Sequence, residues 1–283
     1  IVPDYDLNLM KEKQDLWGLT SSIINKTKEV YHDFVPDLVL VHGDTTTAFA
    51  SALSAFYANI KVGHVEAGLR SFDNQNPFPE EINRVMIDNI STLHFAPTKN
   101  AVKNLLLNGI KKDNIFLTQN TVIDSLLLTS SKVSEIKCKE KIILLTIHRR
   151  ENFGEPLEKI FNAILKLVSN NPGIKVIYPV HPNPNVKNLA YELLGNQDRV
   201  ILKPAQNYVE FVKLMKSSYL IITDSGGIQE EAPSLGKPVL VTRKTTERPE
   251  ALQAGGVRLV GCDEDKIIKE VELLLNNVAE YKK

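Results

Sequence analysis

Short runs rich in β-branched residues alternate with amphipathic helical patterns along almost the whole chain, and this alternation restricts the fold more than any other feature. It is typical of βα units, which assemble into parallel sheets. The first half is predicted to contain strands at Leu38–His42, Lys61–Val65, Leu93–Ala96 and Ile115–Leu117. The second half is predicted to contain strands at Ile142–Ile147, Lys175–Val180, Val200–Leu202, Leu220–Thr223, Pro238–Thr242 and Arg258–Val260, followed by a helix over Glu264–Asn276.

The polar stretch SSKVSEIKCKEK, residues 130–141, has no apolar period and separates the two series of strands. The sequence therefore predicts an N-terminal Rossmann-like domain over 1–130, a linker over 131–141 and a C-terminal Rossmann-like domain over 142–283. Each domain is expected to be a doubly wound α/β sheet, and the two are expected to face one another across a central cleft. Ligands of such sheets bind beyond the carboxyl ends of the strands.

The charge balance and the cysteine content argue against several classes of partner. Lys plus Arg and Asp plus Glu both number 34 among the 283 residues, so the basic surface of a nucleic-acid binder is not expected. Cys138 and Cys262 lie far apart without metal-ligand spacing, which favours a reducing compartment, with the cytoplasm as the expected location. No apolar run is long enough to span a bilayer, so no membrane partner is expected. A small-molecule ligand is favoured.

Polar residues follow two strands of the first half, in the strings VHGDTTT and GHVEAGLR. Side chains two positions apart share a face of a strand, so His42 is paired with Asp44, and His64 with Glu66, at the carboxyl edge of the sheet. The two histidines are interpreted as supporting groups. One alternative for Asp44 is the N-cap of the next helix, because Asp is a good capping residue. Another is that the His and acid pairs form the metal site of a hydrolase.

A third acidic site occurs in the string NPFPEEINR. Pro79 suits the first turn of a helix, and it places Glu80 and Glu81 at the helix N-terminus. The alternative is that these two acids only complement the helix dipole.

The second half carries a polar cluster in LLTIHRREN, directly after an apolar strand. His148, two arginines and an acid at the edge of a strand can hold a diphosphate. The alternative is a solvated loop with internal ion pairs. The string YPVHPNPNV places His181 at another strand end.

The stretch TDSGGIQEEAPSLGKPVL places a pair of glycines between a strand and a helix, directly ahead of adjacent glutamates. Such a turn exposes backbone N–H groups that can bind phosphate, and the acids suit a ligand that carries vicinal hydroxyls as well. A ribose next to a diphosphate has both features. The alternative is an ordinary turn with Ser225 as the helix N-cap. Neither GxxxxGK[ST] nor GxGxxG occurs in the chain.

The strings VHGDTTT, GHVEAGLR, PEEINR, HRREN, PVHPNPNV, TDSGGIQEEAPSLGKPVLV and TTERPEA, in this order, closely resemble those of the non-hydrolysing UDP-N-acetylglucosamine 2-epimerases. The resemblance runs over nearly the whole chain. It implies two Rossmann-like domains with a central cleft, similar to the glycosyltransferase type B fold. It also implies an isomerase that interconverts UDP-N-acetylglucosamine and UDP-N-acetylmannosamine without a metal or other cofactor, as a cytoplasmic homodimer in polysaccharide biosynthesis.

The resemblance also assigns roles to residues, and it makes the C-terminal domain the one that binds UDP. The catalytic residues that it implies are Asp44, Glu66, Glu80 and His148. The substrate-binding residues that it implies are Ser225, Gly226 and Gly227 at the diphosphate, Glu231 at the ribose, Arg248 near the same ligand, and Gln206 and Phe211 at the uracil. The implied reaction is anti elimination of UDP to a 2-acetamidoglucal, followed by addition of UDP to the opposite face.

One difference from the family pattern leaves it undecided whether this chain is active. Members of the family begin with another strand and a GTRPE-like loop, and this chain begins at IVPDYDLNLM, so it is expected to lack the front βα unit. The alternatives are a 2-epimerase, hydrolysing or not, of a related UDP-sugar such as a diacetamido uronic acid, and a UDP-sugar-binding module that is inactive through truncation.

Overall fold

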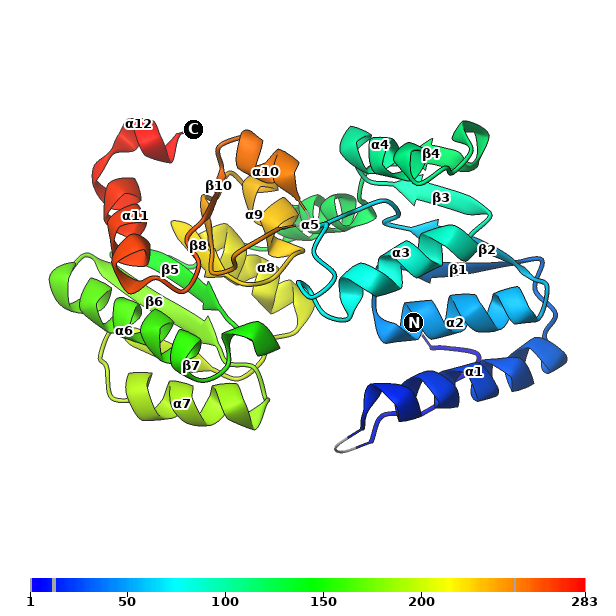
Figure 1. Ribbon diagram of the computed structural model, residues 1–283. Helices are drawn as coiled ribbons and strands as arrows, with labels where there is room; N and C mark the ends of the chain where they lie inside the picture. Colours follow the sequence, from blue (N-terminus) through cyan, green and yellow to red (C-terminus); the bar gives the residue numbers. More distant parts are fainter. Residues whose placement is uncertain (1, 12–13, 247, 283) are drawn as a thin grey trace. The chain divides into compact units, whose positions relative to one another are not determined.

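Two parallel sheets, each flanked by helices, form the framework of the computed structural model, which describes residues 2–11, 14–246 and 248–282 (Figure 1). The chain divides into two compact units between Thr121 and Val122. The α/β fold class predicted from the alternation of strands and helices is therefore confirmed. Glu247 of the TTERPEA string lies outside the described residues.

Unit 1, which ends at Thr121, contains a four-stranded sheet in the order β1-β2-β3-β4. The strands have the bounds predicted from the sequence, namely β1 Leu38–His42, β2 Lys61–Val65, β3 Leu93–Ala96 and β4 Ile115–Leu117. The helices are α1 Leu16–Asp33, α2 Thr46–Tyr57, α3 Glu80–Ile90 and α4 Lys99–Leu107, with a 3-10 turn η1 at Lys112–Asn114. Because β1 and β2 are parallel, their carboxyl ends lie side by side.

Small side chains allow α2 to pack closely in unit 1. The helix buries a row of alanines, namely Ala48, Ala52 and Ala55. Its contact with α1 includes a buried hydrogen bond of 2.7 Å between the hydroxyls of Thr27 and Ser54. Close packing fixes α2 against the strand that precedes it, so the turn between β1 and α2 has a defined position.

Unit 2 contains a six-stranded sheet in the order β10-β9-β8-β5-β6-β7. Its strands are β5 Lys141–Thr146, β6 Ile174–Pro179, β7 Val200–Lys203, β8 Leu220–Thr223, β9 Val239–Val241 and β10 Val257–Leu259, each within one residue of its predicted bounds. Its helices are α6 Glu155–Asn170, α7 Pro184–Leu194, α8 Tyr208–Ser217, α9 Ile228–Ser234, α10 Pro249–Gln253, α11 Glu264–Asn276 and α12 Val278–Tyr281, with a 3-10 turn η2 at Arg150–Asn152. The strand order reverses between β5 and β8, as in a doubly wound sheet.

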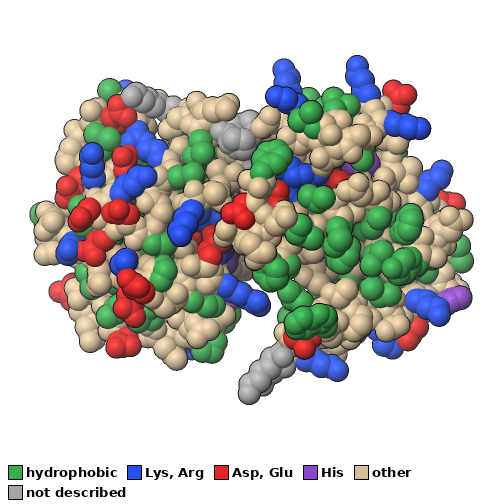
Figure 2. All heavy atoms as spheres, in the orientation of Figure 1, with side chains coloured by type: hydrophobic (Ala, Val, Ile, Leu, Met, Phe, Trp, Pro, Cys, Tyr) green, Lys and Arg blue, Asp and Glu red, His purple; other side chains and the backbone are tan. Residues whose placement is uncertain are grey.

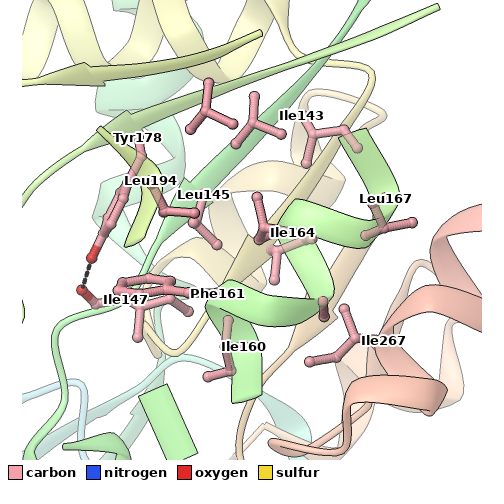
Figure 3. Close-up of a cluster of buried hydrophobic side chains, with 14 of the residues drawn as sticks. Ile143, Leu145, Ile147, Ile160, Phe161, Ile164, Leu167, Tyr178, Leu194 and Ile267 are labelled. Carbon is pink, nitrogen blue, oxygen red and sulfur yellow. Dashed lines mark hydrogen bonds between the residues drawn. The ribbon is translucent and has the colours of Figure 1, made fainter. Parts of the chain in front are cut away.

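The main core of unit 2 lies where α6 packs on the sheet (Figure 3). Phe161 and Ile164 of α6 are fully buried, and the ring of Phe161 lies 5.8 Å from that of Tyr178 on β6. The hydroxyl of Tyr178 donates a hydrogen bond of 2.8 Å to the carbonyl of Ile147, shown as a dashed line in Figure 3. The core therefore fixes the backbone just before His148.

The boundary between the units lies earlier than the predicted end of the first domain at residue 130. The helix α5, Thr121–Lys132, buries Leu126 in the core of unit 2. Val133 and Ile136 of the predicted linker pack against the same core. Two isolated apolar side chains attach the linker to unit 2, and they do not form the apolar face of a helix or strand. The linker sequence therefore shows no apolar period.

On the face shown in Figure 2, charged side chains of both signs are scattered over unit 2, whereas hydrophobic side chains gather over unit 1. Cys138 is exposed, Cys262 is half-buried, and neither forms a disulfide. Within the part of the chain that the structure describes, no helix combines the length and the apolar character that a membrane span requires.

Candidate active site

Asp44 follows β1 and pairs with a buried arginine. Its carboxylate forms an ion pair with Arg84 of α3, and the side-chain amide of Asn83 donates 2.9 Å to the Asp44 carbonyl. The N-cap of α2 is Thr45, whose hydroxyl accepts from the N–H of Ala48, so the interpretation of Asp44 as the cap is wrong. The capping role falls to the next residue, and the Asp44 carboxylate is held by α3 instead.

Glu66 follows β2 in a left-handed backbone conformation, with a φ of 71°. Its Oε2 lies 3.9 Å from Nε2 of His42, and its Oε1 accepts 3.3 Å from the amide of Asn120. A Cβ added to Gly43 would lie 3.3 Å from Glu66 Oε2, so this carboxylate sits beside the turn that leads to Asp44. A non-glycine residue at positive φ costs on the order of 1 kcal/mol, and such strain is found preferentially at functional positions.

The adjacent acids Glu80 and Glu81 have different surroundings. Glu81 is 1% exposed, accepts 3.0 Å hydrogen bonds from the N–H groups of Ser71 and Phe72, and pairs with Arg84 at 3.1 Å. Glu80 begins α3, and its Oε2 is buried without a hydrogen-bond partner among the described residues. Because a buried polar atom without a partner calls for one, Glu80 is suited to a ligand or a transferred proton, and Glu81 holds a loop.

His64 supports the turn at Gly43, as predicted for a supporting group, but its carboxylate partner is Asp88 and not the expected Glu66. The ring is fully buried, with Nδ1 2.6 Å from the Asp88 carboxylate and Nε2 3.0 Å from the Gly43 carbonyl. Arg70 donates 2.7 Å to the other oxygen of Asp88. Burial alone would raise the pKa of Asp88, but the hydrogen bonds and charges of His64 and Arg70 outweigh it and lower this pKa.

A pocket of about 280 Å³ lies at the carboxyl end of β5 in unit 2. Its lining includes the predicted site residues His148, Gln206, Phe211, Ser225 and Glu231. Because the strand order reverses between β5 and β8, this is the switch point at which doubly wound sheets bind ligands. The structure therefore brings residues that were predicted in several separate segments together in one cavity.

The glycine pair forms the turn between β8 and α9. Gly227 is the N-cap of α9, and no side chain caps this helix, so the interpretation of Ser225 as the N-cap is wrong. The Ser225 N–H instead donates 2.9 Å to the hydroxyl of Thr223. A Cβ added to Gly227 would lie 3.7 Å from Oε2 of Glu231, so an acid does lie beside the glycine turn.

Glu231 is a buried acid with a cation nearby. It is 8% exposed, and burial raises its pKa; the charge of Glu230 adds to this rise, and the charge of Arg248 opposes it. Arg248 is itself buried and forms an ion pair with Glu230. Arg248 is not among the lining residues of the pocket, but it lies close enough to act on Glu231 through its charge.

His148 is held at the end of β5 by the buried Asp224. The Asp224 carboxylate accepts 2.9 Å from the His148 N–H and 2.8 Å from the Arg149 N–H. The His148 ring stacks on that of His181, with centroids 5.6 Å apart and planes inclined by 19°. Burial lowers the pKa of His148, the charges of Arg149 and His181 lower it further, and the charge of Asp224 opposes them.

The rest of the HRREN segment is also anchored. Asn152 donates 2.9 Å to Asp224, and Glu151 pairs at 3.0 Å with Arg243, which lies beyond β9. The interpretation of this segment as a solvated loop with internal ion pairs is therefore wrong, because the acid finds its partner in another segment.

Arg84 and Asp224 are the most important of the residues at these sites that were not singled out from the sequence. Arg84 holds Asp44, and Asp224 holds the backbone at His148. A signal existed for Asp224, since it follows the apolar run Leu220–Thr223, and polar residues at the ends of strands are the pattern that drew attention to Asp44. Among the described residues, no group of three or more His, Cys, Asp or Glu side chains is placed to hold a metal ion.

Unit 2 is a doubly wound α/β domain with a pocket at its switch point. The pocket is lined by a histidine, a phenylalanine ring and a buried carboxylate beside a glycine turn, and these groups suit a phosphorylated ligand that carries hydroxyl groups. Residues 1–283 match the family model described as UDP-N-acetylglucosamine 2-epimerase. The chain belongs to this family, which confirms the resemblance seen in its motifs.

Individual relatives agree with the family match. The UDP-N-acetylglucosamine 2-epimerase of Bacillus subtilis is 51% identical over 288 residues, which cover 100% of this chain and 76% of that protein. The crystal structure of UDP-GlcNAc 2-epimerase from Neisseria meningitidis bound to UDP-GlcNAc has a TM-score of 0.97 and 47% identity, over 100% of this chain and 80% of that one. A Staphylococcus aureus structure with UDP has a TM-score of 0.94 and 44% identity, over 100% and 76%.

Proposed function

We propose that the chain interconverts UDP-N-acetylglucosamine and UDP-N-acetylmannosamine by epimerisation at C2. The observation that carries this proposal is the pocket of unit 2, because it joins His148, Ser225 and Glu231 at the switch point of the sheet. Family membership supports it, as does the Neisseria meningitidis relative that was solved with UDP-GlcNAc. The proposed route is anti elimination of UDP to a 2-acetamidoglucal, followed by addition of UDP to the opposite face.

The residues of unit 2 bind the UDP moiety in this proposal. The buried carboxylate of Glu231 accepts hydrogen bonds from the ribose hydroxyls, since an ionised carboxylate offers two acceptor oxygens. The turn of Ser225, Gly226 and Gly227 holds the diphosphate through its N–H groups, with Arg248 supplying positive charge nearby. The remaining two substrate-binding residues, Gln206 and Phe211, contact the uracil.

His148 assists the departure of UDP. When the C1–O bond breaks, negative charge develops on the diphosphate, and a protonated imidazole stabilises it. The pKa of His148 is lowered by burial, so the free protein holds this ring largely neutral near pH 7. A bound diphosphate adds negative charge and raises that pKa, which recruits the proton when the leaving group is present.

Asp44, Glu66 and Glu80 of unit 1 transfer the C2 proton. Elimination removes a proton from C2 as UDP leaves C1, and the return step delivers a proton to the other face of C2. This requires two positioned groups, or one group with a relayed water. The proposal draws support from the left-handed backbone at Glu66, the ion pair of Asp44 with Arg84 and the buried oxygen of Glu80.

The test is to incubate the chain with single UDP-sugars in D₂O and to resolve the products by NMR. UDP-N-acetylglucosamine should give UDP-N-acetylmannosamine with deuterium at C2, and Asp44→Asn should slow this at least about 100-fold, the usual scale for a proton-transfer group. Asp198→Asn, at an exposed position, is the matched control. Conversion without deuterium contradicts elimination. Release of free N-acetylmannosamine indicates a hydrolysing enzyme. Turnover of only another UDP-sugar means that the proposed substrate is wrong, and binding without conversion indicates a binding module.

We further propose that the protein acts in the cytoplasm as a homodimer without a cofactor, and that its product is used in polysaccharide biosynthesis. The reducing compartment favoured by its free cysteines supports the location. Light scattering coupled to size-exclusion chromatography measures the oligomeric state, and a monomeric mass contradicts the homodimer.

A further inference from the structure

We infer that Asp224 is a positioning residue for His148, which fixes the imidazole with Nδ1 protonated toward the carboxylate and leaves Nε2 as the nitrogen that gains and loses a proton. The inference rests on the proposed role of His148 at the leaving group and deepens it, because it names the atom that acts and the residue that selects it.

The carboxylate of Asp224 organises the backbone that carries His148. Asp224 is 0% exposed, and its Oδ2 accepts 2.9 Å from the His148 N–H and 2.8 Å from the Arg149 N–H. The same oxygen accepts 2.9 Å from the side-chain amide of Asn152, whose own oxygen accepts a 3.2 Å contact from the thiol of Cys262. A buried carboxylate is tolerated only when it is hydrogen-bonded, and here each donor comes from or supports the HRREN segment.

The other carboxylate oxygen faces the imidazole ring. Oδ1 of Asp224 lies 3.4 Å from Nδ1 of His148 and also accepts 3.2 Å from the His148 N–H, which is shared between the two oxygens. An ionised carboxylate only accepts hydrogen bonds, so its negative charge at this distance favours a proton on Nδ1 over a bare lone pair there. The partner of one ring nitrogen sets the tautomer of a histidine, so the neutral ring has its proton on Nδ1 and an unprotonated Nε2.

Among the residues that the structure describes, Asp224 is the acid that pairs with the His148 ring. Arg149 follows in the chain, and His181 stacks face to face with the ring, with centroids 5.6 Å apart. Glu231 lines the same pocket. Burial, Arg149 and His181 all lower the pKa of His148, and Asp224 opposes them. Loss of the negative charge at position 224 therefore lowers the pKa of His148 further.

The position of Asp224 in the chain links this ring to the glycine turn. Its N–H donates 3.2 Å to the carbonyl of Thr146 on β5, and the next residues are Ser225, Gly226 and Gly227. One residue thus ties the segment proposed to hold the diphosphate to the histidine proposed to stabilise the charge that develops on it. A shift of the glycine turn therefore moves the Asp224 carboxylate, and through it the backbone of His148.

The substitution Asp224→Asn removes the negative charge of the side chain but keeps nearly the same shape. With its amide oxygen in the place of Oδ2, Asn still accepts from the His148 and Arg149 N–H groups. Its NH₂ group then replaces Oδ1, which gives up the 3.2 Å hydrogen bond from the His148 N–H and places donor hydrogens beside Nδ1. The expected result is a reversal of the neutral tautomer, with the proton moved to Nε2, together with a lower pKa.

The experiment is nitrogen-15 NMR of the imidazoles in the 283-residue chain without UDP, over a pH titration. The His148 signals are assigned by their loss in His148→Gln. The wild type should show the neutral ring protonated on Nδ1, Asp224→Asn should show it protonated on Nε2 with a lower pKa, and Asp198→Asn, an exposed control, should match the wild type.

Two results overturn the inference. One is a wild-type His148 whose neutral form carries its proton on Nε2, and this measurement decides the matter even if Asp224→Asn does not fold. The other is a folded Asp224→Asn protein with the tautomer and pKa of the wild type. Neither readout depends on turnover, so a chain without epimerase activity contradicts the proposed function and leaves the positioning role to be judged by NMR alone.

Discussion

Replacing Glu231 with Gln is expected to weaken UDP binding and to stabilise the folded protein at the same time. Glu231 is 8% exposed, so water screens its hydrogen bonds little. Hydrogen bonds to a charged group exceed neutral ones by about 1 kcal/mol each, so two ribose hydroxyls give a loss of about 2 kcal/mol, or roughly thirtyfold in Kd. Removing a negative charge also relieves repulsion with the diphosphate, but Arg248 already opposes that charge.

The effect on stability follows from the raised pKa of Glu231. Burial disfavours the ionised carboxylate in the folded state, so above this pKa the charge destabilises the fold, and the penalty disappears as the pH falls through it. Glu231→Gln should therefore have a higher Tm than the wild type at pH 7, with the difference shrinking in acid. UDP affinity of the wild type should also decline as the pH falls through the raised pKa.

Isothermal titration calorimetry with UDP and thermal denaturation between pH 5 and 8 measure both effects. Glu192→Gln, at an exposed position on α7, is the matched control and should change neither quantity. A well-folded Glu231→Gln protein that binds UDP as tightly as the wild type would refute the ribose assignment. A lower Tm at pH 7 would refute the assignment of an unfavourable buried charge.

Three further substitutions test other parts of the structure. Glu80→Gln should slow epimerisation about 100-fold with little change in Tm, because its buried oxygen has no partner to lose among the described residues; an unchanged rate removes it from the proton-transfer set. Glu81→Gln should instead lower the free energy of unfolding by roughly 3 kcal/mol in urea denaturation, since it breaks a buried pair with Arg84; wild-type stability contradicts its structural role. Gly68→Ala should destabilise unit 1, because the new Cβ would lie 2.4 Å from the Ala101 carbonyl at a φ of 84°; a soluble protein with the wild-type Tm contradicts this.

The framework of the fold was predictable because each strand is a short apolar run bounded by turn residues. The bounds of β1 and β8 agree with the sequence prediction, as do those of the helix α11. The division into units was less predictable. Val133 and Ile136 attach a polar stretch to unit 2, and isolated apolar contacts of this kind leave no periodic pattern in a sequence.

The candidate site was predictable at the level of residue types at strand ends, but not at the level of partners. Asp44 follows β1 as expected, but the sequence did not tell which of two neighbouring residues caps α2, and in the structure Thr45 is the cap. The pairing of Asp44 with Arg84 joins segments far apart in the chain, and one sequence carries no local signal for such a contact. The same holds for Asp224 and His148.

The central pairing of β5 with β8 has a consequence for the order of folding. The hydroxyls of Thr146 and Thr223 meet at 2.7 Å although they are 77 residues apart in the sequence. Closing so long a loop is entropically costly and slow, so contacts between these strands form late relative to local helices and to the neighbouring pair β5 and β6. The pocket exists only once this pairing is complete. A fluorescent UDP analogue added during refolding should thus bind only after β5 has paired with β8, later than the return of the signal from local helices.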